Sequence, residues 1–147
     1  MKESQLRSIL RLNPDLSIMA DGTIGAPVVY VAPKMSEFDL QTEVFRQCAI
    51  KAETNPAYNL VLAIPNGQVR PGQRIEPGLK RGVPDIAIFA ARHSRHGCFI
   101  ELKISPRKQE PEQLEWQRKL RIEGYICSCI WDDPQKVIDL IEWYLEG

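Results

Sequence analysis

An aspartate, a glutamate and a lysine stand in two short strand-like runs near the middle of the chain. Asp85 opens the run DIAIFA, and Glu101 and Lys103 lie in the run CFIELKI. Two carboxylates beside a lysine could hold a hard divalent cation next to a phosphate, because such cations take oxygen ligands. An acid-x-Lys pattern on a strand is more often a solvated outer face, so the hypothesis depends on where Asp85 lies.

A hairpin between the two runs would bring these residues together. Residues 92–97 are polar, end in glycine and have the length of a hairpin turn. Alternation along the second strand places Glu101 and Lys103 on one face. If the turn centres near Ser94, Asp85 lies opposite Lys103 on that same face, with the two carboxylates in diagonal reach.

Composition limits the class of protein. The 147 residues suffice for one domain with a real core, and the formal net charge of zero means that nucleic-acid binding would need a local patch. The four cysteines form no C-x-x-C pair and are interpreted as small core residues in a reducing compartment. The two histidines, His93 and His96, fall in the predicted turn, which argues against a zinc site. Without a signal-peptide core or a membrane-length apolar run, a soluble cytoplasmic protein is expected.

Apolar periodicity and breaker residues predict the remaining elements. We expect a helix and a hairpin turning at Asp21-Gly22 within residues 1–35, then a helix over 36–53 capped by Ser36. Buried strands are expected over 59–64 and 125–131, and helices over 110–123 and after Pro134.

The helix over 36–53 carries two polar residues within its apolar arc. On a helical wheel Glu37 and Gln41 fall among apolar residues that include Phe38, whereas Glu43 faces solvent. A buried carboxylate is costly unless it has a partner, so Glu37 could point toward the hairpin cluster. Alternatively, Glu37 is a first-turn acid favoured by the helix dipole and open to water.

Cations gather in two segments beside the hairpin. Residues 65–84 form a loop rich in glycine and proline, and residues 105–109 follow the second strand. Such segments could contact the backbone phosphates of a nucleic acid, although a loop that is merely soluble is the alternative. The candidate DNA-binding residues are Arg70, Arg74, Lys80, Arg81, Arg107 and Lys108.

The element order and motifs resemble the PD-(D/E)xK nuclease superfamily. The order is helix, three strands, helix, strand, helix, and the resemblance is closer to the VRR-NUC (virus-type replication-repair nuclease) branch, especially small stand-alone members of phages and bacteria. The matching pieces are SEFDLQ (36–41), IPNGQVR (64–70), LKRGVPD (79–85), IELK (100–103) and EQLEWQRKLRIEGY (112–125). The resemblance implies a nuclease domain over 36–147 after an N-terminal extension over 1–35.

The resemblance also implies a fold and a set of site residues. The expected fold is a restriction-endonuclease-like α/β fold with a central mixed four-stranded sheet flanked by helices. Asp85 and Glu101 resemble the family's metal-binding carboxylates, with the Leu102 carbonyl as a third ligand. Lys103 resembles the lysine that positions the attacking water. The other matching positions are Glu37, Gln41 and Gln113; Glu43 is the alternative to Glu37.

The activity implied by the resemblance is Mg²⁺- or Mn²⁺-dependent cleavage of DNA, often at branched or flapped structures. The resemblance also implies a homodimer, similar to Holliday-junction resolvases that act in DNA repair and recombination. Two other hypotheses stay open. The chain could be a catalytically silent DNA-binding module with a nuclease fold, or a sequence-specific restriction-type nuclease. Nothing in the sequence excludes RNA as the substrate.

Overall fold

The computed structural model describes residues 17–18, 24–25, 34–65, 71–72, 74 and 76–147. The chain divides into two compact units, Met1–Lys34 and Met35–Gly147. In the first unit, β1 (Ser17–Ile18) pairs antiparallel with β2 (Ile24–Gly25). The predicted turn at Asp21-Gly22 and the helix predicted before it lie outside the described residues.

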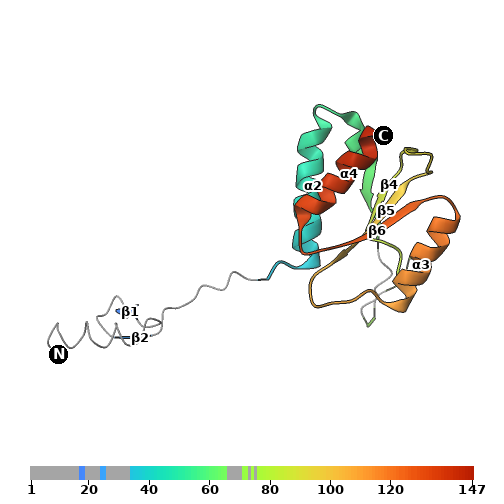
Figure 1. The fold of residues 1–147 in the computed structure, drawn as a ribbon. Helices are drawn as coiled ribbons and strands as arrows, with labels where there is room; N and C mark the ends of the chain where they lie inside the picture. The colour runs from blue at the N-terminus through green and yellow to red at the C-terminus, as the bar shows by residue number, and fades with distance from the viewer. Residues whose placement is uncertain (1–16, 19–23, 26–33, 66–70, 73, 75) are drawn as a thin grey trace. The chain divides into compact units, whose positions relative to one another are not determined.

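A mixed four-stranded sheet forms the centre of the second unit (Figure 1). Its strands lie in chain order, with antiparallel pairing from β3 to β5 and a parallel pair between β5 and β6. The strands are β3 (Val61–Ala63), β4 (Ile86–Ile88), β5 (Cys98–Lys103) and β6 (Ile126–Trp131). The helices are α2 (Glu37–Ala52), the 3-10 helix η1 (Pro56–Leu60), α3 (Pro111–Ile122) and α4 (Pro134–Glu146). The predicted fold class and element order are confirmed. Among the described residues, no helix is long and apolar enough to cross a membrane.

The two faces of the sheet are covered by different helices. Helices α2 and α4 lie on one side of the strands and α3 on the other (Figure 1). Side chains at every fourth position of α2 pack with α4 and with alternate residues of the strands, because strand side chains alternate between the faces. This core includes Leu40, Val44, Cys48, Ile86, Ile88, Cys98, Ile100, Leu102, Ile138, Ile141 and Tyr144. The odd-numbered residues of β5, including Glu101 and Lys103, are left to point to the other face.

Three sequence-based expectations about burial are wrong. Phe38, expected within the buried arc of α2, is 78% exposed. The run over 59–64 is not a buried strand, since its first part is η1 and Leu62 of the edge strand β3 is 49% exposed. Strand β6 is only half-buried over most of its length. Both strands lie at the edges of the sheet, and an apolar run in the sequence does not distinguish an edge strand from a central one.

The predicted register of the hairpin is also corrected. Ile86 lies opposite Ile100 and Ile88 opposite Cys98, so the same register places Asp85 opposite Glu101 rather than Lys103. The error is two residues along one strand. Because side chains repeat every two residues, Asp85 and Glu101 still share a face.

A β-bulge sets this register. The chain reverses at His93 and Ser94, which have positive φ of 50° and 56°, between the bridged residues Arg92 and Arg95. From that bridge to the Ile88–Cys98 pair, residues 89–91 lie on one strand and only 96–97 on the other. Without this extra residue, every side chain of β4 and the residue before it would point to the opposite face. The bulge therefore decides on which face Asp85 lies.

Helix α3 anchors the segment that leads into Asp85. The Trp116 indole donates a hydrogen bond to the Arg81 carbonyl over 2.8 Å. The next residue, Gly82, has φ +79°, and a Cβ there would lie 2.8 Å from the Glu112 Cβ. A glycine is needed at this position for both its conformation and its close approach to the helix.

We predict that Gly82→Ala destabilises the domain by roughly 1–3 kcal/mol, because the methyl group meets α3 and the residue keeps a left-handed conformation. Urea unfolding measures this. Gly78→Ala is the matched control, since Gly78 has φ +91° but a Cβ added there would have no described neighbour within 4 Å. Equal losses of stability in the two variants would contradict the packing role of Gly82.

Candidate active site

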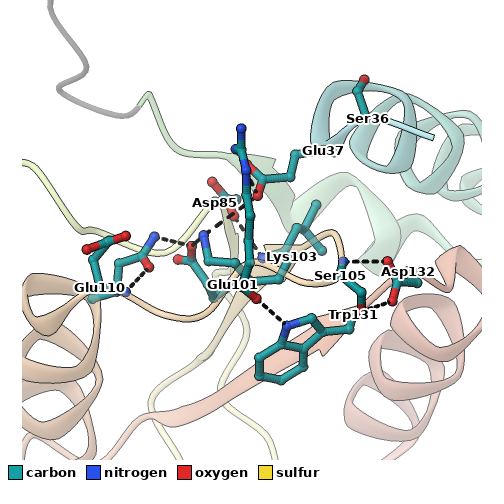
Figure 2. Close-up of polar contacts among 12 residues, drawn as sticks. Ser36, Glu37, Asp85, Glu101, Lys103, Ser105, Glu110, Trp131 and Asp132 are labelled. Carbon is teal, nitrogen blue, oxygen red and sulfur yellow. Dashed lines mark hydrogen bonds and ion pairs between the residues drawn. The ribbon is translucent and has the colours of Figure 1, made fainter. Parts of the chain in front are cut away.

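One cluster of polar side chains lies at the end of the hairpin away from its turn (Figure 2). Asp85 comes from the residue before β4, and Glu101 and Lys103 come from β5. Glu37 and Gln113 come from the first turns of α2 and α3. The structure thus brings together five of the six side chains predicted from the sequence.

A buried ion pair forms the centre of the cluster. Glu101 is 1% exposed and Lys103 is 6% exposed, and the Lys103 Nζ lies 2.9 Å from the Glu101 Oε1. The Gln113 side-chain amide donates a hydrogen bond to the same oxygen. The other oxygen, Glu101 Oε2, is buried and has no hydrogen-bond partner among the described residues. An uncompensated buried carboxylate oxygen is costly, which points to a ligand for it.

The charges of the cluster shift the ionisation of both partners. Burial, with the negative charge of Asp85 as the next cause, raises the pKa of Glu101 to about 7. Burial, the largest single cause, would lower the pKa of Lys103, but its hydrogen bond to Glu101 and the negative charges of Glu101, Glu37 and Asp85 together outweigh burial and raise it. Lys103 therefore keeps its positive charge, whereas the Glu101 carboxylate lacks sufficient compensating charge.

Asp85 is held against the central strand by the backbone. Its Oδ2 accepts a hydrogen bond of 2.8 Å from the Leu102 amide. The Leu102 side chain is buried in the core, so this peptide unit is fixed on both sides. That the Leu102 carbonyl is a metal ligand stays a prediction.

Glu37 reaches the cluster from the start of α2. Ser36 caps the helix, and the Asp39 side chain bonds back to the Ser36 backbone, which fixes the first turn. The Glu37 Oε1 then lies 3.8 Å from the Lys103 Nζ and 3.6 Å from an Arg107 guanidinium nitrogen. Glu37, predicted to partner the hairpin, is thus within ion-pair distance of it.

The other two polar residues considered on α2 lie differently. Glu43 pairs with Arg46 and Gln47 of its own helix, with nitrogen–oxygen distances of 2.7 and 2.8 Å. Gln41 is half-buried one turn beyond Glu37. Its side chain makes no hydrogen bond to any described residue of the cluster, so the structure does not join Gln41 to it.

Gln113 links the cluster to the N-terminus of α3. Its Oε1 accepts a hydrogen bond of 2.8 Å from the Glu110 amide, while its nitrogen donates to Glu101. The two bonds fix which end of the amide faces Glu101. The residue thereby holds the carboxylate in one orientation.

The predicted DNA-binding cations fall into three groups. Arg107 lies beside Glu37 and is 73% exposed at its side chain. Lys108, Arg74, Lys80 and Arg81 are exposed, with no ion pair to the described residues. Arg70 lies outside the described residues. Among the described cations of this set, only Arg107 therefore contacts the carboxylate cluster directly.

Sequence reasoning missed a polar clamp at the edge of the site. Asp133 caps α4 by accepting a hydrogen bond from the Gln135 amide. Asp132 instead accepts hydrogen bonds from the Ser105 amide, over 2.8 Å, and from the Ser105 hydroxyl. No local pattern signals this contact, because the two residues lie far apart in the sequence.

The donor set fits a small oxygen-binding cation. No group of three or more His, Cys, Asp or Glu side chains with metal-site spacing occurs within the described ranges. Mg²⁺ nevertheless binds through one or two carboxylates together with waters and substrate phosphate. The Glu101 Oε2, which has no hydrogen-bond partner among the described residues, and the neighbouring Asp85 carboxylate would suit such an ion. The same residues do not suit zinc in a thiolate and imidazole site.

Comparison with known proteins agrees with this geometry. No protein-family model matches the sequence, and no curated protein does. A solved structure described as a "VRR_NUC domain protein" matches with a TM-score of 0.63 and 27% sequence identity, over 77% of this chain and 90% of that one. In this chain the E-x-K residues singled out by the sequence motifs lie on β5, an inner strand of the mixed sheet. This similarity supports a VRR-NUC domain of nuclease type, and the chain shares the restriction-endonuclease-like α/β fold.

Proposed function

We propose that the protein is a metal-dependent DNA endonuclease that selects branched substrates and hydrolyses phosphodiester bonds. One observation carries this proposal. Glu101 is buried between Lys103 and Gln113, with one carboxylate oxygen unpartnered beside Asp85. A domain that only bound DNA would gain nothing from an incompletely compensated carboxylate on its central strand.

Asp85, Glu101 and the Leu102 carbonyl would hold Mg²⁺ or Mn²⁺. When bound, the ion polarises the phosphate and makes its own water more acidic. Gln113 occupies one oxygen of Glu101, which leaves the other oxygen for the ion. Lys103 keeps its charge and would hold the attacking water or a phosphate oxygen. Glu37 would help to hold the ammonium group of Lys103 in place.

Selection by DNA shape, rather than by base sequence, follows from the kind of contacts available. The candidate contacts are exposed cations on loops, and cations of this kind bind phosphates without reading bases. The family resemblance adds a homodimer, acting in DNA repair or recombination within the cytoplasm of a bacterial or phage-infected cell. Two symmetry-related sites would suit a four-way junction.

Cleavage of a labelled substrate panel tests the proposed function. The panel contains linear duplex, single strand, 5′ flap, splayed arms and a four-way junction, with Mg²⁺, Mn²⁺ or EDTA. We expect metal-dependent cutting of branched DNA that Asp85→Ala lowers by more than about 100-fold, because loss of a ligand should exceed the loss of a group that merely supports one. Glu43→Ala, an acid on α2 paired within its own helix, is the control.

Other outcomes separate the alternatives. Tight binding of DNA without cleavage in the presence of either metal would favour the silent DNA-binding module and contradict the proposed nuclease activity. Cutting at one defined sequence in linear duplex would instead favour a restriction-type nuclease. RNA cleavage in a parallel panel would replace DNA as the substrate class.

Metal binding can be measured without DNA. Saturating Mg²⁺ should raise the Tm of the protein by several degrees, since ligand at a hundred times Kd contributes about 2.7 kcal/mol. Glu101→Gln keeps the shape of the side chain but removes its charge, so the Mg²⁺-dependent shift should disappear. Glu43→Gln should keep the full shift. An undiminished shift in Glu101→Gln would show that the ion binds elsewhere.

The salt dependence of DNA binding tests the exposed loop. Replacing Arg74, Lys80 and Arg81 with Ala should weaken binding and reduce the slope of log K against log salt by about 2 to 3, if each cation contacts one phosphate. Replacing Arg46 and Arg118, which are paired within their own helices, is the control for lost charge. An unchanged slope in the loop variant would show that these three cations do not contact DNA phosphates.

A further inference from the structure

An exposed tryptophan lies beside the candidate active site. Trp131 ends β6, and its Cα is the pairing partner of Lys103 on β5. Residues paired across neighbouring strands share a face, so Trp131 projects on the side of the sheet that carries Lys103 and Glu101 (Figure 2). The side chain is 39% exposed. A large apolar ring is thus left in water next to charged groups.

The only polar atom of this ring is already used. The Trp131 indole nitrogen donates a hydrogen bond of 3.1 Å to the Arg107 carbonyl. What the side chain offers to solvent is therefore its aromatic surface, which can bind a ligand only by apolar contact, stacking or a cation. The same hydrogen bond fixes the orientation of the ring relative to the cationic loop.

The backbone around Trp131 is held rigidly. Asp132 adopts a positive φ of 60°, an unfavourable conformation for a residue other than glycine. Its amide donates to the Lys103 carbonyl over 3.0 Å, and its carboxylate binds Ser105. These contacts tie the end of β6 to the segment that follows Lys103. Trp131 and Arg107 consequently keep fixed positions beside the carboxylate cluster.

The rings of the other two tryptophans have aromatic or cationic neighbours, although Trp143 is itself 50% exposed. The Trp143 ring stacks on His93, with centroids 4.2 Å apart and planes 12° from parallel. The Trp116 ring has the Lys119 ammonium group 5.9 Å from its centroid. Trp131 has no such aromatic or cationic neighbour among the described residues. Trp131 is thus the exposed ring that lies next to Lys103 in the sheet.

The surrounding charges indicate what that partner is. Arg107 and Lys108 project from the same short loop, and Lys103 lies on the adjacent strand. An aromatic surface beside cations is the composition with which proteins bind single-stranded nucleic acid: the cations hold phosphates and the ring stacks on a base. Within a continuous duplex both faces of each base are occupied by neighbours. At a branch or a single-stranded end, a base face becomes free.

We propose that Trp131 stacks on an unpaired base close to the scissile phosphodiester, and that this contact gives the nuclease its preference for branched DNA. The inference deepens the proposed function and rests on it. It assigns to Trp131 a role in substrate selection that is separate from the chemistry of Asp85, Glu101 and Lys103. In a linear duplex the ring would find no free base face, and binding would depend on phosphate contacts alone.

Stacking can be measured on the full-length protein without cleavage. A splayed-arm DNA carries the fluorescent base 2-aminopurine at successive unpaired positions beside the branch, and binding is followed in EDTA. Stacking on an indole quenches this fluorescence. We expect quenching at one or two adjacent positions with the wild type and with Trp143→Ala, and its loss with Trp131→Ala. In the presence of Mg²⁺, Trp131→Ala should also lower the ratio of branched to duplex cleavage by about tenfold, the size of one stacked base.

Trp131→Phe separates stacking from a structural role. Phenylalanine keeps an aromatic surface but cannot donate to the Arg107 carbonyl. We expect it to keep most of the preference for branched DNA. If Trp131 merely anchored the loop, both variants would lose activity equally on branched and duplex DNA, and the proposal would be overturned.

The fluorescence experiment also distinguishes failure of the inference from failure of the proposed function. Quenching that depends on Trp131, in a protein that cuts nothing, would support base stacking while removing the nuclease activity. Metal-dependent cleavage of branched DNA with no quenching at any position would retain the nuclease and refute the role of Trp131.

Discussion

The buried ion pair between Glu101 and Lys103 is the constraint on which the arrangement of this domain depends. Two charges are removed from water on the central strand, and such a pair is tolerated only when other groups satisfy its remaining atoms. Gln113 serves one oxygen of Glu101, and Glu37 faces the ammonium group of Lys103. These partners come from the capped N-termini of two helices on opposite sides of the sheet, so the positions of both helices are coupled to one pair of side chains.

The alternation of side chains along a strand imposes the second constraint. Asp85 can lie beside Glu101 only if the pairing of the two strands places both side chains on the same face of the sheet. The turn at His93 and Ser94 would by itself place them on opposite faces. The bulge at residues 89–91 shifts the pairing by one residue, which brings both side chains to the same face. The His93 ring of this turn stacks on the Trp143 ring of α4. The extra residue near the turn thus decides whether two carboxylates meet at the other end of the hairpin.

The sequence predicts local features of the site better than features that depend on distant parts of the chain. Alternation is a local property, so the shared face of Glu101 and Lys103 could be read from β5 alone, and a two-residue error in register left the predicted face of Asp85 unchanged. Burial depends instead on which strand lies at an edge and how a helix starts, which is why Phe38 and Leu62 were misjudged. The clamp between Ser105 and Asp132 joins the ends of two parallel strands. Parallel neighbours are separated by a whole helix in the chain, and no short pattern records their contact.

The groups suited to chemistry and those suited to recognition differ in how they are held. Glu101 and Lys103 are buried on a central strand, where packing restricts their motion and low exposure strengthens every charge interaction. Arg107 and Trp131 lie at the margin of the same cluster, exposed to solvent but fixed through the Arg107 carbonyl and the Asp132 clamp. Under the proposed function, a change of substrate preference would need only marginal side chains to be altered, whereas any change to the buried pair would disturb the sheet itself. Lys103 is the counterion of Glu101 and, in that proposal, also the cation that faces the substrate, so folding and chemistry would depend on the same ammonium group. The partners that satisfy this pair in the free protein would then also orient it for reaction.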